Sequence, residues 1–233
     1  MADELTETNT LMTHRTRIKL CGLTRDEDVQ AAVAAGADAI GLVFYEGSPR
    51  YVAPRRAEEM LSKVPPFICS VGLFVNASAD QVEKVTKQAA LTALQFHGDE
   101  TPQTCAEIAS RVNRPFLRAL RVKPEMTADD LLKYALDYRQ ASPLFSGLLL
   151  DTWVEAYGGS GKVFDWSLVP KELAHQAVLS GGLTVQNVAE AIVRLRPYAV
   201  DVSSGIEQSK GIKDAAKMQA FVDAVRAAES KLS

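Results

Sequence analysis

The sequence predicts a single closed (β/α)8 barrel preceded by a short disordered N-terminal tail. Short apolar runs rich in β-forming residues alternate with amphipathic helical stretches, and eight such runs begin roughly every 21 to 31 residues, the length of a strand–helix unit. The runs lack clean polar–apolar alternation, as expected for strands buried on both faces. Eight units in 233 residues match the roughly 200 to 250 residues that a TIM barrel needs.

The first unit has the clearest boundaries. Its strand is expected over 17–21 (RIKLC) and its helix over 26–36 (DEDVQAAVAAG). Thr24 and Glu27 have the spacing of a capping box, which predicts that Thr24 opens this helix. Gly36 is placed to end it, because glycine readily adopts the left-handed conformation at a helix C-terminus.

The other units follow the same pattern along the chain. Their strands are expected over 38–44, 67–75, 91–96, 115–122, 146–151, 175–182 and 198–205. Apolar residues at three- and four-residue spacing predict helices over 78–89, 101–112, 184–195 and 214–232. The sixth unit is the weakest, because a long loop after residue 151 leads to a short helix.

The chain is expected to form one barrel domain over 17–233 after a polar tail over 1–16. No Pro-, Gly- or Ser-rich linker divides it, and the N-terminus lacks the apolar segment of a secretory signal. The alternative fold is an open doubly wound sheet, since periodicity does not show whether a sheet closes.

Composition narrows the possible partners. A formal net charge of -3 with both signs interspersed argues against nucleic acid and anionic membranes, although backbone geometry still allows small anions to bind. The three cysteines are odd in number and lack CxxC spacing, which predicts neither a disulfide framework nor a zinc site. A cytoplasmic protein fits best, with no apolar stretch long enough to span a bilayer.

In a barrel, functional residues lie at the carboxyl ends of the strands. Small residues follow the last two strands: Gly181 and Gly182 after the seventh, and Ser203, Ser204 and Gly205 after the eighth. Their backbone N–H groups can form a concave anion site, which favours a phosphorylated small-molecule ligand. The alternative is that these residues only form tight turns. The segment 158–162 (GGSGK) lacks P-loop spacing and is rejected as one.

Two further strand ends carry groups able to move protons. Asp151 ends an apolar run and is a candidate general acid. The alternative is that its side chain only caps the turn that follows the strand. Cys21 ends the first strand and is either a buried packing residue or a reactive thiol. Lys19 lies two residues earlier, on the same side of the strand, where its ammonium group would stabilise a thiolate.

Three other side chains are candidates for ligand contacts. Arg50 could bind a carboxylate through its fork of donors, or it is simply solvated. His97 lies just past the fourth strand, where it could act as an acid, a base or a hydrogen-bond donor. Asp201 is interpreted as a buried carboxylate that holds the phosphate loop. His14 lies in the tail, and His175 precedes the seventh strand at the wrong end of the barrel.

Taken in order, several segments resemble the phosphoribosylanthranilate isomerase family. They are IKLCGLT, GLVFYEGSPRYV, VGLFVN, LQFHGDE, LLLDTWVEAYGGSGKVFDW, LSGGLTVQNV and AVDVSSGIE. The resemblance runs from about residue 17 to the last helix. The chain departs from the family pattern at Leu20, in the extra tail, and at Ser-Lys before the glycine of EQSKGIKD. These departures are slight, and none of them touches a proposed catalytic position.

The resemblance implies an Amadori rearrangement of N-(5'-phosphoribosyl)anthranilate in tryptophan biosynthesis, with no cofactor and no metal. It implies that Asp151 is the general acid, that Cys21 is the general base, and that Arg50 contacts the anthranilate carboxylate. The alternatives are another phosphosugar barrel, such as indoleglycerol-phosphate synthase, and a catalytically silent phosphosugar-binding barrel. A monomer or a homodimer is expected.

Overall fold

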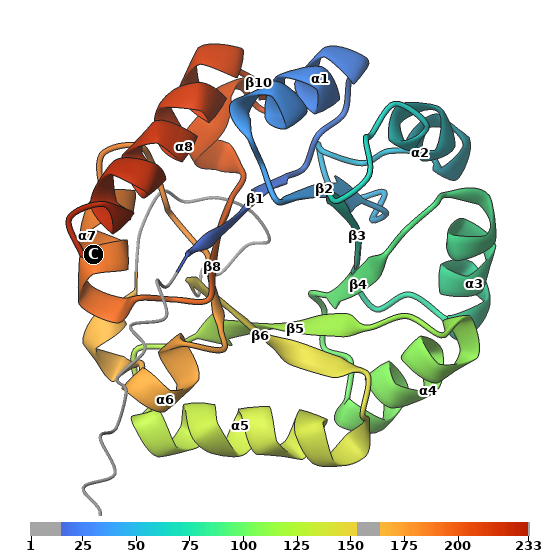
Figure 1. Ribbon diagram of the computed structural model, residues 1–233. Coiled ribbons are helices and arrows are strands. Elements are labelled where there is room, and N and C mark those ends of the chain that lie inside the picture. Colours follow the sequence, from blue (N-terminus) through green and yellow to red (C-terminus); the bar gives the residue numbers. More distant parts are fainter. Residues whose placement is uncertain (1–14, 153–163, 233) are drawn as a thin grey trace, which may run out of the picture.

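The computed structural model describes residues 15–152 and 164–232, in which eight parallel strands close into a barrel (Figure 1). The closure is made by β1 and β8, which pair with Lys19 opposite Asp201. The predicted closed barrel is confirmed, and the open sheet is excluded. The strands are β1 (Arg17–Cys21), β2 (Ala39–Val43), β3 (Cys69–Phe74), β4 (Ala93–Phe96), β5 (Phe116–Val122), β6 (Phe145–Thr152), β7 (Val178–Leu179) and β8 (Ala199–Val202).

Helices surround the strands on the outside of the barrel (Figure 1). They are α1 (Asp26–Ala35), α2 (Pro54–Leu61), α3 (Ala79–Gln88), α4 (Pro102–Val112), α5 (Ala128–Ala141), α6 (Lys171–Ala174), α7 (Val188–Leu195) and α8 (Ala215–Glu229). The helix of the sixth unit is short, as predicted, with four residues after a 3₁₀ turn over Trp166–Leu168. Within the described residues, no helix combines the length and the apolar character needed to cross a bilayer.

The predicted capping box of α1 is wrong, while the predicted first residue of the helix and its predicted end are confirmed. Arg25 occupies the N-cap position without a side-chain cap, while the Thr24 hydroxyl donates to the carbonyl oxygen of Gly211, 2.8 Å away. The capping box does not form because this distant loop takes the Thr24 side chain. Gly36 ends the helix at φ 86°, a left-handed conformation that glycine adopts without steric cost.

The barrel interior changes from apolar to polar along its axis. A small buried cluster of Ala119, Leu149, Val178 and Ala199 lies inside the barrel, apart from the main core between strands and helices. Side chains alternate along a strand, so the next side chain that points into the barrel lies two residues after each of Leu149, Val178 and Ala199. Those positions carry Asp151, Ser180 and Asp201. An apolar floor therefore supports a polar layer at the carboxyl ends of the strands.

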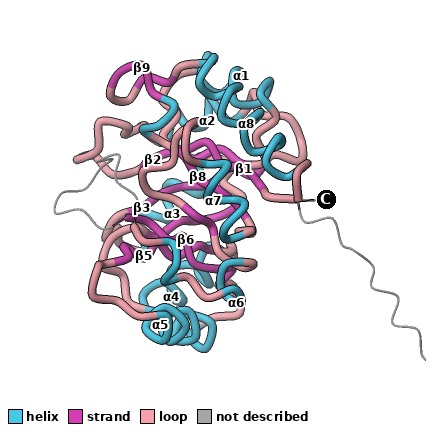
Figure 2. The backbone as a smooth tube through the Cα atoms, turned by 90° about the vertical axis from the view of Figure 1, so that its left-hand side faces the viewer, coloured by secondary structure: helices cyan, strands magenta, loops and turns pink. Residues whose placement is uncertain are grey.

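An antiparallel hairpin extends this end of the barrel after β8. A 3₁₀ turn over Ser204–Ile206 leads into β9 (Glu207–Ser209) and β10 (Ile212–Lys213), and α8 begins only afterwards. In Figure 2 the hairpin lies at one end of the barrel, and α8 runs from there toward the other end.

Two residues assigned to the tail from the sequence contact the barrel. Arg15 pairs with Asp38 at 2.7 Å, and the carbonyl oxygen of Thr16 accepts a hydrogen bond from Arg226 at 2.9 Å. The rest of the predicted tail with His14, and the glycine-rich segment 158–162, lie outside the described residues.

Candidate active site

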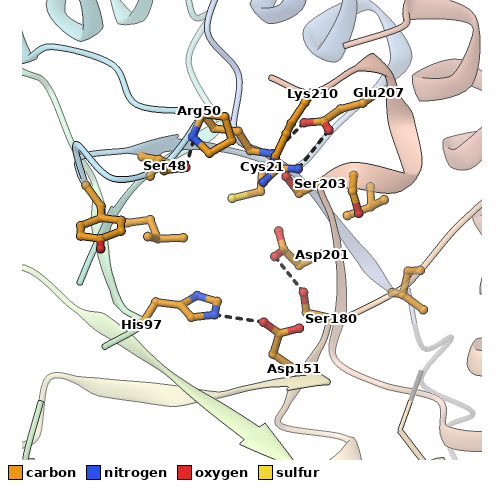
Figure 3. A pocket seen from close by; sticks show the side chains of 18 of the residues that line it. Cys21, Ser48, Arg50, His97, Asp151, Ser180, Asp201, Ser203, Glu207 and Lys210 are labelled. Atoms are coloured by element: carbon orange, nitrogen blue, oxygen red, sulfur yellow. Dashed lines mark hydrogen bonds and ion pairs between the residues drawn. The ribbon is translucent and has the colours of Figure 1, made fainter. Parts of the chain in front are cut away.

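A cavity of about 540 Å³ opens at the carboxyl end of the barrel (Figure 3). The structure brings nearly all the predicted site residues to its wall: Cys21, Arg50, His97, Asp151, Gly181, Gly182, Asp201, Ser203 and Ser204. Cys21 and Asp151 point into it from opposite sides (Figure 3). Gly205 lies behind the wall, where a Cβ would meet the carbonyl oxygen of Leu183 at 2.1 Å, so glycine allows the loops after β7 and β8 to approach each other closely. His175 is not part of the wall.

The sulfur of Cys21 lies in a space that a neighbouring glycine keeps open. Cys21 is 4% exposed and pairs with Gly41 of β2 in the barrel register. A Cβ at Gly41 would lie 2.6 Å from the sulfur and 3.1 Å from Lys19 Nζ. Lys19 Nζ in turn donates to Asp201 Oδ1 at 2.7 Å, and both side chains are buried. The thiol therefore shares its surroundings with a buried ion pair.

Burial raises the pKa of the Cys21 thiol, and this is the largest influence on it. Lys19 and Lys213 lower that pKa, as predicted for Lys19, while the carboxylate of Asp201 raises it further. The net shift is upward. The prediction that Lys19 lowers the pKa of Cys21 is confirmed. The sequence could not show that burial of the sulfur raises this pKa by more than Lys19 lowers it.

We expect Lys19→Met to raise the pKa of Cys21 further, because the substitution removes the cation that faces the sulfur. Asp201→Asn should lower it, because the substitution removes the nearest anion. Thiolate absorbance, titrated in a background that lacks Cys69 and Cys105, measures both changes. An unchanged titration in Lys19→Met would remove Lys19 from any role in activating the thiol.

The other side of the cavity carries a carboxyl group and an imidazole. Asp151 Oδ1 accepts a hydrogen bond from the Thr152 N–H at 2.8 Å, and Oδ2 lies 3.0 Å from His97 Nε2. The side chain of Asp151 is 23% exposed and that of His97 is 18% exposed. Both groups are thus held by the protein while still reaching the cavity.

Two loops beside Cys21 and Asp201 offer backbone donors. Gly181 and Gly182 have φ values of 76° and 67°, in the left-handed region that favours glycine. Ser180, at the base of this loop, donates from Oγ to Asp201 Oδ2 at 3.2 Å, consistent with the predicted loop-holding role of Asp201. Among the described residues, the N–H groups of Gly182 and Ser204 make no hydrogen bond to another residue, so they are available to an anion.

Arg50 is not solvated, contrary to the alternative considered for it. Its Nε and Nη2 donate to the two carboxylate oxygens of Glu207 at 2.7 and 3.0 Å. Lys213, whose side chain is fully buried, donates from Nζ to Glu207 Oε1 at 3.0 Å and to the carbonyl oxygen of Ser203 at 2.9 Å. The hairpin therefore fixes Arg50 at the wall of the cavity.

Gln95, Glu207 and Lys213 are among the polar residues of this site that sequence reasoning missed. Gln95 had a recognisable signal, because it is a polar residue within the apolar strand run and lies two positions before His97, on the same face. Glu207 and Lys213 had none, since only the folded hairpin brings them to Arg50.

These features define the chain as a (β/α)8-barrel enzyme whose site lies at the usual end of the barrel. A family model described as N-(5'-phosphoribosyl)anthranilate (PRA) isomerase matches residues 18–224. The chain belongs to this family, and it is an isomerase.

Relatives and solved structures agree with this assignment. The chain is 63% identical to the N-(5'-phosphoribosyl)anthranilate isomerase of Herminiimonas arsenicoxydans, over 95% of this chain and 97% of the relative. It is 59% identical to that of Ralstonia nicotianae, over 94% and 96%. The crystal structure of the Thermotoga maritima enzyme matches with a TM-score of 0.80 and 40% identity, over 91% of this chain and 99% of that one.

One solved structure adds a ligand. It holds phosphoribosyl anthranilate isomerase in complex with reduced 1-(o-carboxyphenylamino)-1-deoxyribulose 5-phosphate. It matches this chain with a TM-score of 0.75 and 37% identity, over 91% of this chain and 99% of that one.

Proposed function

We propose that the chain converts N-(5'-phosphoribosyl)anthranilate into 1-(o-carboxyphenylamino)-1-deoxyribulose 5-phosphate, a step of tryptophan biosynthesis, with Asp151 as general acid and Cys21 as general base. The observation that carries the roles is that the two groups face one cavity from opposite sides, with backbone anion donors beside them. This matches a reaction that needs one proton delivered and another removed at neighbouring atoms.

In the first step, protonated Asp151 gives its proton to the ribose ring oxygen. The bond between C1 and that oxygen breaks, its electron pair stays on the oxygen as a hydroxyl group, and C1 becomes part of an iminium ion. The thiolate of Cys21 then removes the proton on C2. The electrons of that C–H bond form the C1–C2 double bond of an enolamine, which tautomerises to the ketone product.

The two ends of the substrate match the two charged parts of the cavity. The phosphate is assigned to the loops of Gly181, Gly182, Ser203 and Ser204, because the N–H groups of Gly182 and Ser204 have no hydrogen-bond partner among the described residues. The anthranilate carboxylate is assigned to Arg50, whose remaining guanidinium N–H groups have no partner among the described residues after the two bonds to Glu207.

Arg50→Ala should raise KM on the order of 10- to 100-fold with a smaller effect on kcat, because a hydrogen bond to a charged group is worth about 1.5–3 kcal/mol. Arg55→Ala, in a side chain that is 86% exposed on α2, is the matched control and should leave KM unchanged. Steady-state kinetics measure both variants. An unchanged KM in Arg50→Ala would assign the carboxylate to another group.

The test of function is the loss of substrate fluorescence when purified protein is added. The enzyme should consume the substrate with many turnovers per protein molecule. A silent binding barrel would change the signal only once, in proportion to the protein added. Chromatography of the product separates this activity from that of indoleglycerol-phosphate synthase, which forms an indole ring.

Every residue assigned here comes from one chain, so a monomer and a homodimer can both be active. One structural relative, from Thermotoga maritima, is described as dimeric. We place the protein in the cytoplasm, because Cys21, Cys69 and Cys105 are all free thiols. Light scattering measures the assembly state, and activity per chain should not change on dilution.

A further inference from the structure

Gln95 lies beneath the acid side of the cavity and has no place in the mechanism so far. It belongs to β4, two residues before His97, so the two side chains extend into the barrel on the same face. Gln95 is fully buried and lines the cavity wall. Its Nε2 lies 2.9 Å from His97 Nδ1, while its Oε1 has no hydrogen-bond partner within the described part of the chain.

These contacts determine where the imidazole carries its proton. An amide nitrogen donates and does not accept, so with the Gln95 amide in this orientation the Nδ1 that faces Nε2 is the unprotonated ring nitrogen. The proton of neutral His97 is then on Nε2, which lies 3.0 Å from Asp151 Oδ2. A continuous chain of donors therefore runs from Gln95 through His97 to Asp151.

We propose that Gln95 is a positioning residue that fixes the Nε2–H tautomer of His97 and so aims a hydrogen-bond donor at the general acid. The inference rests on the proposed role of Asp151.

The tautomer has two chemical consequences. With Nε2 already protonated, His97 cannot take the proton of Asp151, and that proton remains for the ribose ring oxygen. Once Asp151 has given it up, the Nε2–H group donates to the new carboxylate and stabilises it. Both effects favour proton transfer to the substrate, and neither requires His97 to touch the substrate.

The first test is the nitrogen chemical shifts of His97 in ¹⁵N-histidine-labelled protein, which distinguish the two tautomers and the imidazolium. Wild type should show the Nε2–H tautomer. Gln95→Glu places an acceptor against Nδ1, so it should move the proton to Nδ1 or give the imidazolium. Gln95→Met removes the amide and leaves neither a donor nor an acceptor against Nδ1, so it should give a mixture of tautomers. Ser70→Ala, which removes a buried hydroxyl at the opposite end of the barrel, should leave the His97 signals unchanged.

The second test separates kcat from KM in the same proteins. Partners that orient an imidazole through its second nitrogen typically matter by about 10- to 100-fold, so Gln95→Met and Gln95→Glu should lower kcat by about that factor. KM should stay within about twofold, because the anion contacts of the substrate are intact. Ser70→Ala should keep the kcat of wild type even if its thermal stability falls.

Two outcomes would overturn the inference, and a different one would overturn the function. Wild-type His97 in the Nδ1–H form, or Gln95→Met with unchanged kcat, would rule out Gln95 as the positioning residue. If either result is found while Asp151→Asn is inactive, the proposed function stands and only the role of Gln95 is wrong. If Asp151→Asn keeps wild-type kcat, the acid role itself is wrong.

Discussion

Asp151→Asn should lower kcat by about 10²- to 10⁴-fold, the usual contribution of a single general acid. Asparagine has nearly the same shape, but it has no proton of suitable acidity to give to the ribose ring oxygen. It also offers one acceptor oxygen where Asp151 uses two, for the Thr152 N–H and for His97 Nε2. Single-turnover fluorescence at saturating substrate measures the loss.

A matched variant controls for the change of a carboxylate to an amide. Asp223→Asn alters an exposed residue of α8 whose carboxylate accepts a hydrogen bond from Gln219 on the preceding turn, and it should turn over like wild type. Circular dichroism should show that both variants are folded. Near-normal kcat in Asp151→Asn would transfer the acid role to another group of the cavity.

Cys21→Ala should have a loss of similar size, about 10²- to 10⁴-fold in kcat, because it removes the base that takes the C2 proton. Cys21→Ser should be nearly as poor, since a hydroxyl group is a much weaker acid than a thiol and hardly ionises near neutral pH. Cys105→Ala is the control. It removes a thiol on the buried face of α4, with its pKa raised by burial to about 12, and should cost stability rather than turnover.

The raised pKa of Cys21 gives this prediction a pH dependence. Only the thiolate can accept the C2 proton, and its fraction grows as the pH approaches the pKa from below. In wild type this gain is offset because Asp151 must be protonated in the same enzyme form, so kcat/KM should stay level between the pKa values of the two groups. The residual kcat/KM of Asp151→Asn, which has no acid to lose, should increase from neutral to alkaline pH, and adding Lys19→Met should move that increase to higher pH. A flat profile in Asp151→Asn would mean that the titrating sulfur does not limit the reaction.

The barrel was predictable because its signals are local and repeated. Apolar runs and helical spacing lie within short windows, and the strand ends then indicate where Cys21, Asp151 and the glycine loops must meet. Contacts between distant segments were not predictable. Arg50 meets a partner 157 residues away, and Thr24 bonds to a loop 187 residues away. The pKa direction of Cys21 also depends on packing around the sulfur, which no sequence window contains.

The seam between β1 and β8 sets when, during its own synthesis, the chain can become an enzyme. Lys19 leaves the ribosome early, but its partner Asp201 follows 182 residues later, which takes on the order of 10 to 40 seconds at about 5–20 residues per second. Until then the nascent chain carries Cys21, His97 and Asp151 without the eighth strand. A buried ammonium group with no counter-ion is costly, so the half-made barrel stays open at this edge. Catalysis therefore begins only after the eighth strand has been synthesised.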